Sequence, residues 1–77
     1  MEWQKGMFVH VMNKDKVLNG IVKSVNGSGD PFIVYNCGDD WENFANYTAN
    51  LTYPDDVIQG WIPTNDVQKA YYDAHSS

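Results

Sequence analysis

The sequence predicts an all-β protein of one domain, residues 1–77, built as a small five-stranded barrel that ends in a short C-terminal helical turn. Three observations support this class. Short apolar runs with period-two alternation recur along the chain, turn-forming residues separate them about every ten residues, and helical patterns are almost absent. A hydrophobic content of 43% with three Trp, five Tyr and three Phe excludes a disordered acidic chain.

Three strands are expected in the first half of the chain, at residues 7–12, 17–25 and 32–35. In the first of them Val9 and Val11 share one face, and His10 lies on the other as an exposed or partly packed residue. In the second, Gly20 sits where a strongly bent barrel strand accepts a glycine kink or bulge. The Asn-Gly pair that opens the loop at 26–31 is the strongest local signal for a hairpin.

Shorter elements are expected in the second half. The predicted order is a loop or short helical turn at 36–46, a strand at 47–52, a single helical turn at 57–59, a strand at 61–62, and a final helical turn or short helix at 66–72. Asp55 or Asp56 is expected to cap the single turn. Thr64 or Asn65 caps the final one, and residues 75–77 are expected to fray.

The charge is distributed unevenly along the chain. Five lysines face ten carboxylates, the sequence has no arginine, and the formal net charge is −5. Residues 1–37 carry four Lys against three acids, whereas residues 38–77 carry one Lys against seven acids. Because arginine supplies the bidentate contact to phosphate and guanine, its absence from an acidic chain argues against nucleic acid as a ligand. The acidic half is either a solvated surface that keeps the protein soluble or a face for a basic protein partner.

Catalytic and metal-binding signatures are scarce, so neither an enzyme nor a cofactor is expected. His10 and His75 lie at opposite ends of the chain, and the single Cys37 has no partner cysteine. Cys37 is expected to be a small buried apolar residue in a reducing compartment. The acids at 39–42 and 55–56 offer oxygen ligands for calcium, but they lack the spacing of a known calcium loop and are interpreted as solvated.

Neither membrane association nor secretion is expected. No apolar run approaches the roughly 18 residues that a membrane span needs, and the first five residues lack a basic region followed by an apolar one. A cytoplasmic protein is therefore the expectation. At this length a single core is only just sufficient, so the sequence predicts a monomer of modest stability or a homodimer.

One stretch near the C-terminus resembles a known family. It reads Gly60-Trp61-Ile62-Pro63-Thr64-Asn65-Asp66-Val67. It is similar to the last segment of the SH3 domain, except at Asp66, where the family carries an aromatic that walls its peptide groove. Residues 41–67 look like the second half of an SH3 domain. Residues 20–23 are more similar to Tudor, KOW and other SH3-like barrels of bacteria and phages, and a small acidic barrel of this kind also resembles orphan proteins of mobile genetic elements.

The SH3 resemblance implies a groove that binds proline-rich peptides. The positions that match the family are Trp41 for the groove tryptophan, Pro63 for the groove proline, Asn65 for the groove asparagine, and Asp39, Asp40 and Glu42 for the acidic specificity loop. The resemblance therefore predicts that these side chains share one surface.

The aromatic residues of the acidic half also predict a binding function. A small barrel has room to bury only some of them, and those left outside form a patch. Aromatic surface beside carboxylates suits basic or proline-containing peptides. Trp61 is expected in the core, whereas Trp41 is either part of the patch or a lid over the core. We therefore expect a non-enzymatic module that binds a protein or peptide through residues Asp39, Asp40, Trp41, Glu42, Phe44, Tyr53, Pro63 and Asn65.

Two other functions stay open. One is an oligomeric barrel that holds a nucleotide or another small molecule between its subunits. The other is an acidic decoy that occupies the site of a nucleic-acid-binding protein. The plasmid-borne type II dihydrofolate reductase is also a small barrel, but its pore is lined by a Val-Gln-Ile-Tyr segment, whereas Val67-Gln68 is followed here by Lys69-Ala70. That difference gives the enzyme little support.

Overall fold

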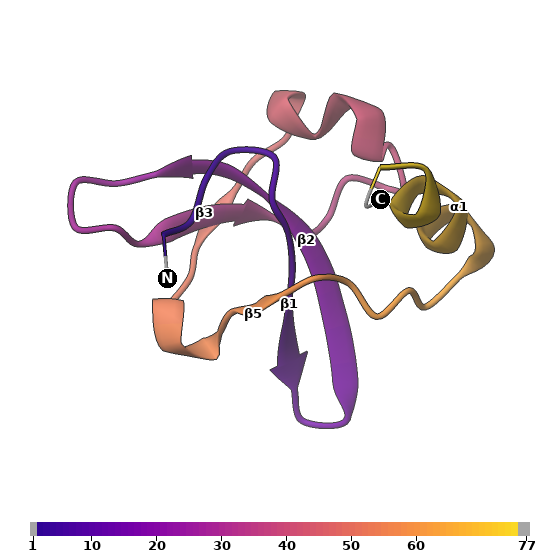
Figure 1. The fold of residues 1–77 in the computed structure, drawn as a ribbon, viewed down its shortest axis with the longest axis horizontal. Coiled ribbons are helices and arrows are strands. Elements are labelled where there is room, and N and C mark those ends of the chain that lie inside the picture. Colours follow the sequence, from indigo (N-terminus) through magenta and orange to yellow (C-terminus); the bar gives the residue numbers. More distant parts are fainter. Residues whose placement is uncertain (1, 76–77) are drawn as a thin grey trace.

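Five strands form one antiparallel sheet, and a helix at the C-terminal end packs beside it (Figure 1). The computed structural model describes residues 2–75. The strands are β1 (Phe8–Asn13), β2 (Lys16–Val25), β3 (Pro31–Val34), β4 (Asn50–Leu51) and β5 (Ile58–Gln59). The helices are the short 3₁₀ helices η1 (Trp41–Asn46) and η2 (Pro54–Asp56) and the α-helix α1 (Asp66–His75). The order across the sheet is β4-β3-β2-β1-β5, so the sheet is open, with β4 and β5 at its two edges.

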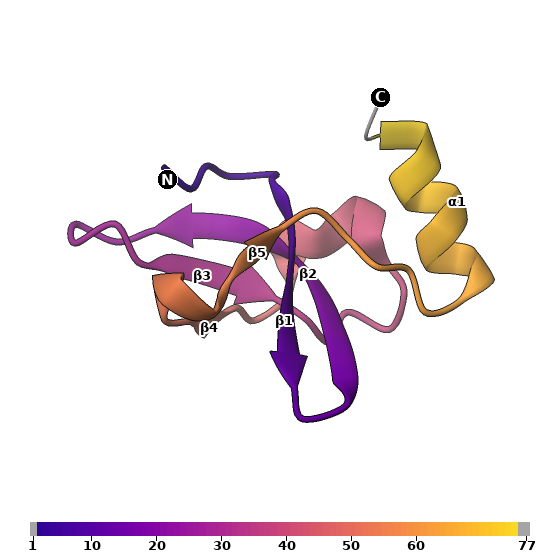
Figure 2. The same cartoon turned by 60° about the horizontal axis from the view of Figure 1, so that its bottom comes forward.

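The long strand β2 organises the sheet, because it pairs with β1 along one half and with β3 along the other. β1 and β2 form a hairpin whose register places Phe8 opposite Ile21. The register with β3 shifts between Val22 and Ser24. Figure 2 shows that β1 and the first half of β2 turn away from β3, so the sheet is strongly bent.

Gly20 is required by the close approach of β2 and β3. An added Cβ would lie 2.5 Å from Cγ2 of Ile33 and 2.9 Å from the carbonyl oxygen of Val34. The irregularity of β2 falls instead at residues 22–24. The glycine thus lies in a bent strand, as predicted, but its role is to leave van der Waals space for β3 and not to form a bulge.

Each face of the sheet carries its own hydrophobic core. Neighbouring residues of a strand point to opposite faces, so Ile21 and Val22 belong to different cores. The first core contains Trp3, Val9, Val22, Ile33 and Val57. The second core contains Ile21, Val34, Cys37, Trp41 and Trp61, with Phe8, Phe44, Tyr47, Ala49, Tyr71 and Tyr72 packed against it. Residues of η1 and α1 cover the second core, which is the aromatic side of the molecule.

The last strand lies earlier than the sequence predicts. The strand expected at 61–62 is absent, and β5 pairs with β1 just before it. Side chains of β1 and β2 make hydrogen bonds to the backbone of residues 60 and 62 instead. The Nδ1–H of the buried His10 donates to the carbonyl of Gly60 (2.8 Å), and the amide of Asn19 bonds both the N–H (3.0 Å) and the carbonyl (2.8 Å) of Ile62. A segment whose polar groups are satisfied in this way needs no strand ladder.

Other predictions for the second half are corrected in position and length. The helical turn expected at 57–59 lies earlier, at η2, where Pro54 occupies the first turn. The strand expected at 47–52 is reduced to the two residues of β4. α1 is longer than expected and ends at His75, while residues 76–77, expected to fray, lie outside the described residues. Within the described chain no helix has the length and apolar character needed to cross a membrane.

Candidate functional site

Trp41 belongs to the core and not to the surface. Its side chain is 3% exposed and packs edge-on against Trp61, with ring centroids 4.6 Å apart. Trp61 is buried as predicted, and its indole N–H donates to the carbonyl oxygen of Gly20 (2.7 Å). Among the described residues the indole N–H of Trp41 has no hydrogen-bond partner. Of the two roles left open for Trp41, the structure shows the core lid, so this residue supplies no exposed wall for a groove.

Two carboxylates of the predicted acidic loop make contacts within the fold. Asp40 accepts hydrogen bonds from the Tyr47 hydroxyl (2.7 Å) and from the Asn43 amide (2.9 Å). The bond to Asp40, followed by burial, raises the pKa of the Tyr47 hydroxyl. Asp39 adopts a φ of +65°, and its carboxylate lies 3.5 Å from the side-chain nitrogen of Asn65. These contacts tie the start of η1 to the loop before α1.

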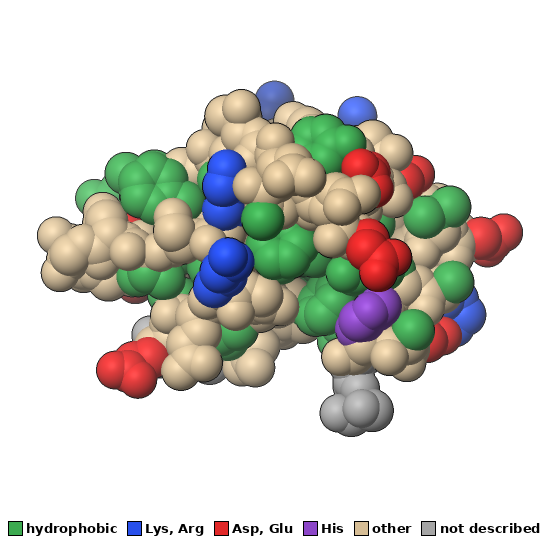
Figure 3. All heavy atoms as spheres, turned by 90° about the horizontal axis from the view of Figure 1, so that it is seen from above, with side chains coloured by type: hydrophobic (Ala, Val, Ile, Leu, Met, Phe, Trp, Pro, Cys, Tyr) green, Lys and Arg blue, Asp and Glu red, His purple; other side chains and the backbone are tan. Residues whose placement is uncertain are grey.

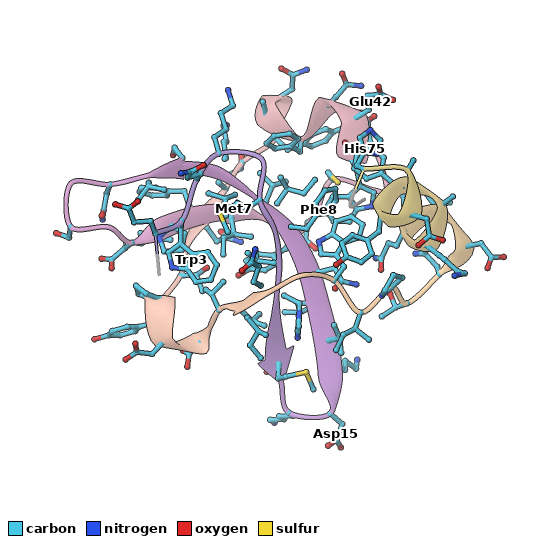
Figure 4. The ribbon with its side chains drawn as sticks, viewed as in Figure 1. Trp3, Met7, Phe8, Asp15, Glu42 and His75 are labelled. Carbon is cyan, nitrogen blue, oxygen red and sulfur yellow. The ribbon has the colours of Figure 1, made fainter. Side chains whose placement is uncertain are left out.

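Glu42 is a further exposed carboxylate near α1. It lies in the first turn of η1, and Figure 4 shows it at the end of η1 nearest α1. Burial raises the pKa of Tyr71 on α1, and the negative charge of Glu42 raises it further. Phe44, also on η1, is half buried against the second core. The acidic and aromatic groups therefore meet where η1 approaches α1.

The remaining predicted residues lie at two separate places. Asn65 caps α1, since its Oδ1 accepts a hydrogen bond from the backbone N–H of Gln68 (2.7 Å), and the half-buried Pro63 lies just before it. Tyr53 precedes η2 and is 77% exposed. In Figures 1 and 2, η2 and α1 lie at opposite ends of the molecule. Tyr53 is therefore separated from the acidic residues near α1.

Aromatic rings fix α1 against the sheet. The ring of Phe8 lies 4.8 Å from Trp61 and 5.2 Å from Tyr72, measured between centroids. Tyr72 also stacks on Trp61 at 5.7 Å. Near the end of α1 the ring of His75 stacks on Tyr71 at 4.1 Å, and its Nδ1–H donates to the Tyr71 carbonyl (2.8 Å). Pairs of this kind contribute about 0.5–1.5 kcal/mol each beyond the area that they bury.

A cleft of about 460 Å³ opens between the start of β1 and α1. Its lining consists of Gly6, Met7, Phe8, Gln59, Gly60, Tyr72 and His75. Phe8 and Tyr72 provide apolar faces, and Figure 4 shows Phe8 and His75 approaching this region from β1 and α1. Polar groups come from Gln59, His75 and the Tyr72 hydroxyl. Gly60 keeps the cleft open, because its φ is +95° and an added Cβ would lie 3.1 Å from the Tyr72 hydroxyl.

The surface seen from above the view of Figure 1 has an apolar centre. Figure 3 shows hydrophobic side chains gathered in the middle of the face, with lysines toward one side and acidic side chains beside a histidine on the other. Such a face offers ring and aliphatic contacts at its centre and a site for positive charge at its acidic border.

Cys37 lies in the second core and does not line the cleft. Burial raises the pKa of Cys37, which keeps the thiol protonated and makes it a weak nucleophile. Residues 2–75 contain no group of three or more His, Cys, Asp or Glu side chains placed to hold a metal ion.

None of the residues that line the cleft is among the predicted binding residues, although Tyr72 belongs to the aromatic set of the acidic half; Phe8 and His75 belong to neither set. The signals were present. Alternation along the first strand places Phe8 opposite the face of Val9, and Tyr71 and His75 are four residues apart on a helix. Neither pattern shows by itself that the helix folds back over the strand.

Comparison with known proteins finds no match to this chain among family models, curated proteins or solved structures.

Proposed function

We propose that this protein is a non-enzymatic binding module that recognises a basic or proline-containing segment of a protein partner. The binding face is the aromatic-acidic cleft, defined as the cleft lined by Phe8, Tyr72 and His75 together with Glu42, which lies outside the lining at the end of η1 nearest α1. The observation that carries the proposal is an open cleft with aromatic walls beside an exposed carboxylate. Concave sites with a few convergent polar groups are the usual places for ligands.

The aromatic walls suit a proline ring. Proline-containing segments are extended before they bind, and their rings pack on aromatic faces. Phe8 and Tyr72 are held in place because both contact the buried Trp61 (4.8 and 5.7 Å). A preorganised wall loses little conformational freedom on binding, which favours affinity.

The acidic border suits a positive charge next to that proline. Glu42 lies near Tyr71, whose ring stacks on His75 at the edge of the cleft. A lysine or arginine of the ligand can pair with Glu42 while its stem lies on these rings. The net charge of −5 also attracts a basic partner at long range.

We also propose that the fold is an SH3-like barrel in the cytoplasm, and that the protein belongs among the orphan proteins of mobile genetic elements. The five antiparallel strands and the strong bend of β2 support the barrel, since a bent sheet brings its edges toward each other. Support for the other two proposals comes from the sequence: the single cysteine supports the cytoplasm, and the acidic composition supports the mobile-element origin.

Calorimetric titration tests the binding function with an acetylated and amidated Pro-Pro-Lys-Pro-Pro peptide. Glu42→Gln should weaken binding about two- to fivefold, the size expected for an exposed ion pair. Asp55→Asn removes the same charge at η2 and should leave the affinity unchanged. Equal losses in the two variants, or equal binding of a peptide with alanine in place of every proline, would contradict the proposal.

An oligomer that holds a small molecule between subunits is the second candidate. It is favoured by apolar side chains left exposed around β5 and the start of α1, namely Ile58 (49%), Ile62 (49%) and Val67 (50%). Sedimentation of the full chain at micromolar concentration separates the two functions. A monomer supports the binding module, whereas a stable dimer or tetramer supports the shared pocket.

A further inference from the structure

A second cleft lies beside η2. Figure 2 shows η2 and α1 at opposite ends of the molecule, so this cleft is far from the aromatic-acidic cleft. Its volume is about 220 Å³, and its lining consists of Asp30, Leu51, Thr52, Tyr53 and Pro54. The Tyr53 side chain is 77% exposed and that of Leu51 is 56% exposed. A large ring and an aliphatic side chain that share a cleft in solvent mark an interaction site.

The walls of this second cleft are held by backbone hydrogen bonds. The N–H of Thr52 donates to the carbonyl of Pro31 on β3 (3.0 Å). The carbonyl of Tyr53 accepts from the N–H of Asp56 (3.0 Å), which closes the turn of η2. On the opposite side, the N–H of Asp30 donates to a side chain of the 26–30 loop (2.9 Å). The backbone of the cleft is therefore fixed before a ligand arrives, which lowers the entropic cost of binding.

The polar groups of the second cleft differ in what they already bond. The Thr52 hydroxyl lies 3.0 Å from the Tyr35 hydroxyl and 3.2 Å from the Asn50 carbonyl, so it is engaged. The carboxylate of Asp30 takes part in no hydrogen bond or ion pair among residues 2–75. The cleft thus presents one available carboxylate between apolar and aromatic walls.

We propose that the second cleft binds an arginine side chain of a protein partner. The methylene stem of the arginine packs along Leu51 and Pro54, and its guanidinium stacks on the exposed ring of Tyr53. The guanidinium fork then donates two parallel hydrogen bonds to the carboxylate of Asp30. This site is independent of the aromatic-acidic cleft and of the function proposed for it.

Charge decides between the occupants of this cleft. The carboxylates that follow Pro54 in η2, Asp55 and Asp56, add negative potential at the corner. A second copy of the chain is a poor occupant, because the sequence has no arginine and two copies of net charge −5 repel each other. Lysine is a less suitable ligand, since its ammonium lacks the planar fork that matches a ring face and a carboxylate together.

Chemical-shift titration of the ¹⁵N-labelled full chain tests this site with acetyl-Gly-Arg-Gly-amide as the probe. The shifts should map to Asp30 and residues 51–54, and the citrulline version of the peptide, neutral and of the same shape, should bind at least about fivefold more weakly. Tyr53→Ala should reduce the affinity about three- to fivefold, whereas Tyr53→Phe, which retains the ring, should stay within about twofold. Because Tyr53 is largely exposed, both variants are expected to fold.

A pair of charge variants completes the test. Asp30→Asn should weaken the arginine peptide about fivefold, whereas Asp15→Asn, which removes an equal charge in the turn between β1 and β2, should change it less than twofold. Equal effects of the two variants would overturn the proposal and indicate a general electrostatic attraction. Three other results would overturn it as well. They are equal binding of the citrulline peptide or of a peptide with lysine in place of the arginine, shifts centred on Phe8 and Tyr72, and self-association through residues 51–54.

Discussion

Replacement of Trp41 by alanine separates a core role from a surface role. The side chain is 3% exposed and packs on Trp61 at 4.6 Å, so its removal leaves a cavity in the second core. Truncation of a buried tryptophan costs about 3–5 kcal/mol. A domain of 77 residues is stable by roughly 4–12 kcal/mol. Trp41→Ala should therefore remove a large part of the free energy of unfolding and lower the thermal midpoint by more than about 10 °C.

Urea unfolding followed by circular dichroism measures this loss. Trp41→Phe is the matched control, because it retains a ring beside Trp61 and removes an indole N–H that has no partner among the described residues. Its loss of stability should be less than half that of the alanine variant, since most of the cavity stays filled. A free energy of unfolding for Trp41→Ala within about 0.5 kcal/mol of the parent protein, the range of ordinary surface substitutions, would refute the core assignment.

Three other changes test the packing of the sheet and its buried polar groups. Gly20→Ala should lower the free energy of unfolding by about 1–3 kcal/mol or more, because the added Cβ overlaps β3. Gly27→Ala has nothing within 4 Å of its added Cβ and should change the free energy of unfolding by less than about 1 kcal/mol. Equal urea midpoints for the two variants would contradict the close approach of β2 and β3. Asn19→Ala should cost about 1–3 kcal/mol because it leaves backbone groups of residue 62 without partners, and an unchanged midpoint would count against this clamp. Burial raises the pKa of Tyr35, and a carboxylate hydrogen bond raises that of Tyr47, both above the ordinary value of 10.0. The folded protein therefore binds these two hydroxyl protons more tightly than the unfolded chain does. The stability that this contributes is complete below about pH 10 and is lost as the pH rises above that value. Thermal midpoints that do not change between about pH 8 and 11 would contradict this prediction.

The first half of the fold is predictable because its signals are local. Alternating apolar residues define the strands, and the Asn-Gly pair at 26–27 marks the turn between β2 and β3. The course of residues 60–62 is not predictable in this way. It depends on hydrogen bonds from His10 and Asn19, which lie some 40 to 50 positions earlier in the sequence. A local pattern contains no information about such partners.

The candidate site also combines features that local sequence predicts with features that depend on distant residues. The acidic loop and the cap at Asn65 follow from residue types, and the structure places them together beside α1. The burial of Trp41 depends on the ring that packs against it, and this ring comes from Trp61, twenty positions later in the chain, which a local pattern does not place. Tyr53 is close in sequence to the other predicted residues, but it directly precedes η2, which lies at the end of the molecule far from α1.

The most direct test of the binding function is a chemical-shift titration of the ¹⁵N-labelled full chain with the Pro-Pro-Lys-Pro-Pro peptide. The aromatic-acidic cleft predicts saturable shifts at Phe8, Tyr72, His75 and Glu42, with residues 51–54 unaffected. Shifts confined to other parts of the chain, or none at millimolar peptide, would contradict the assignment of this cleft as the binding face.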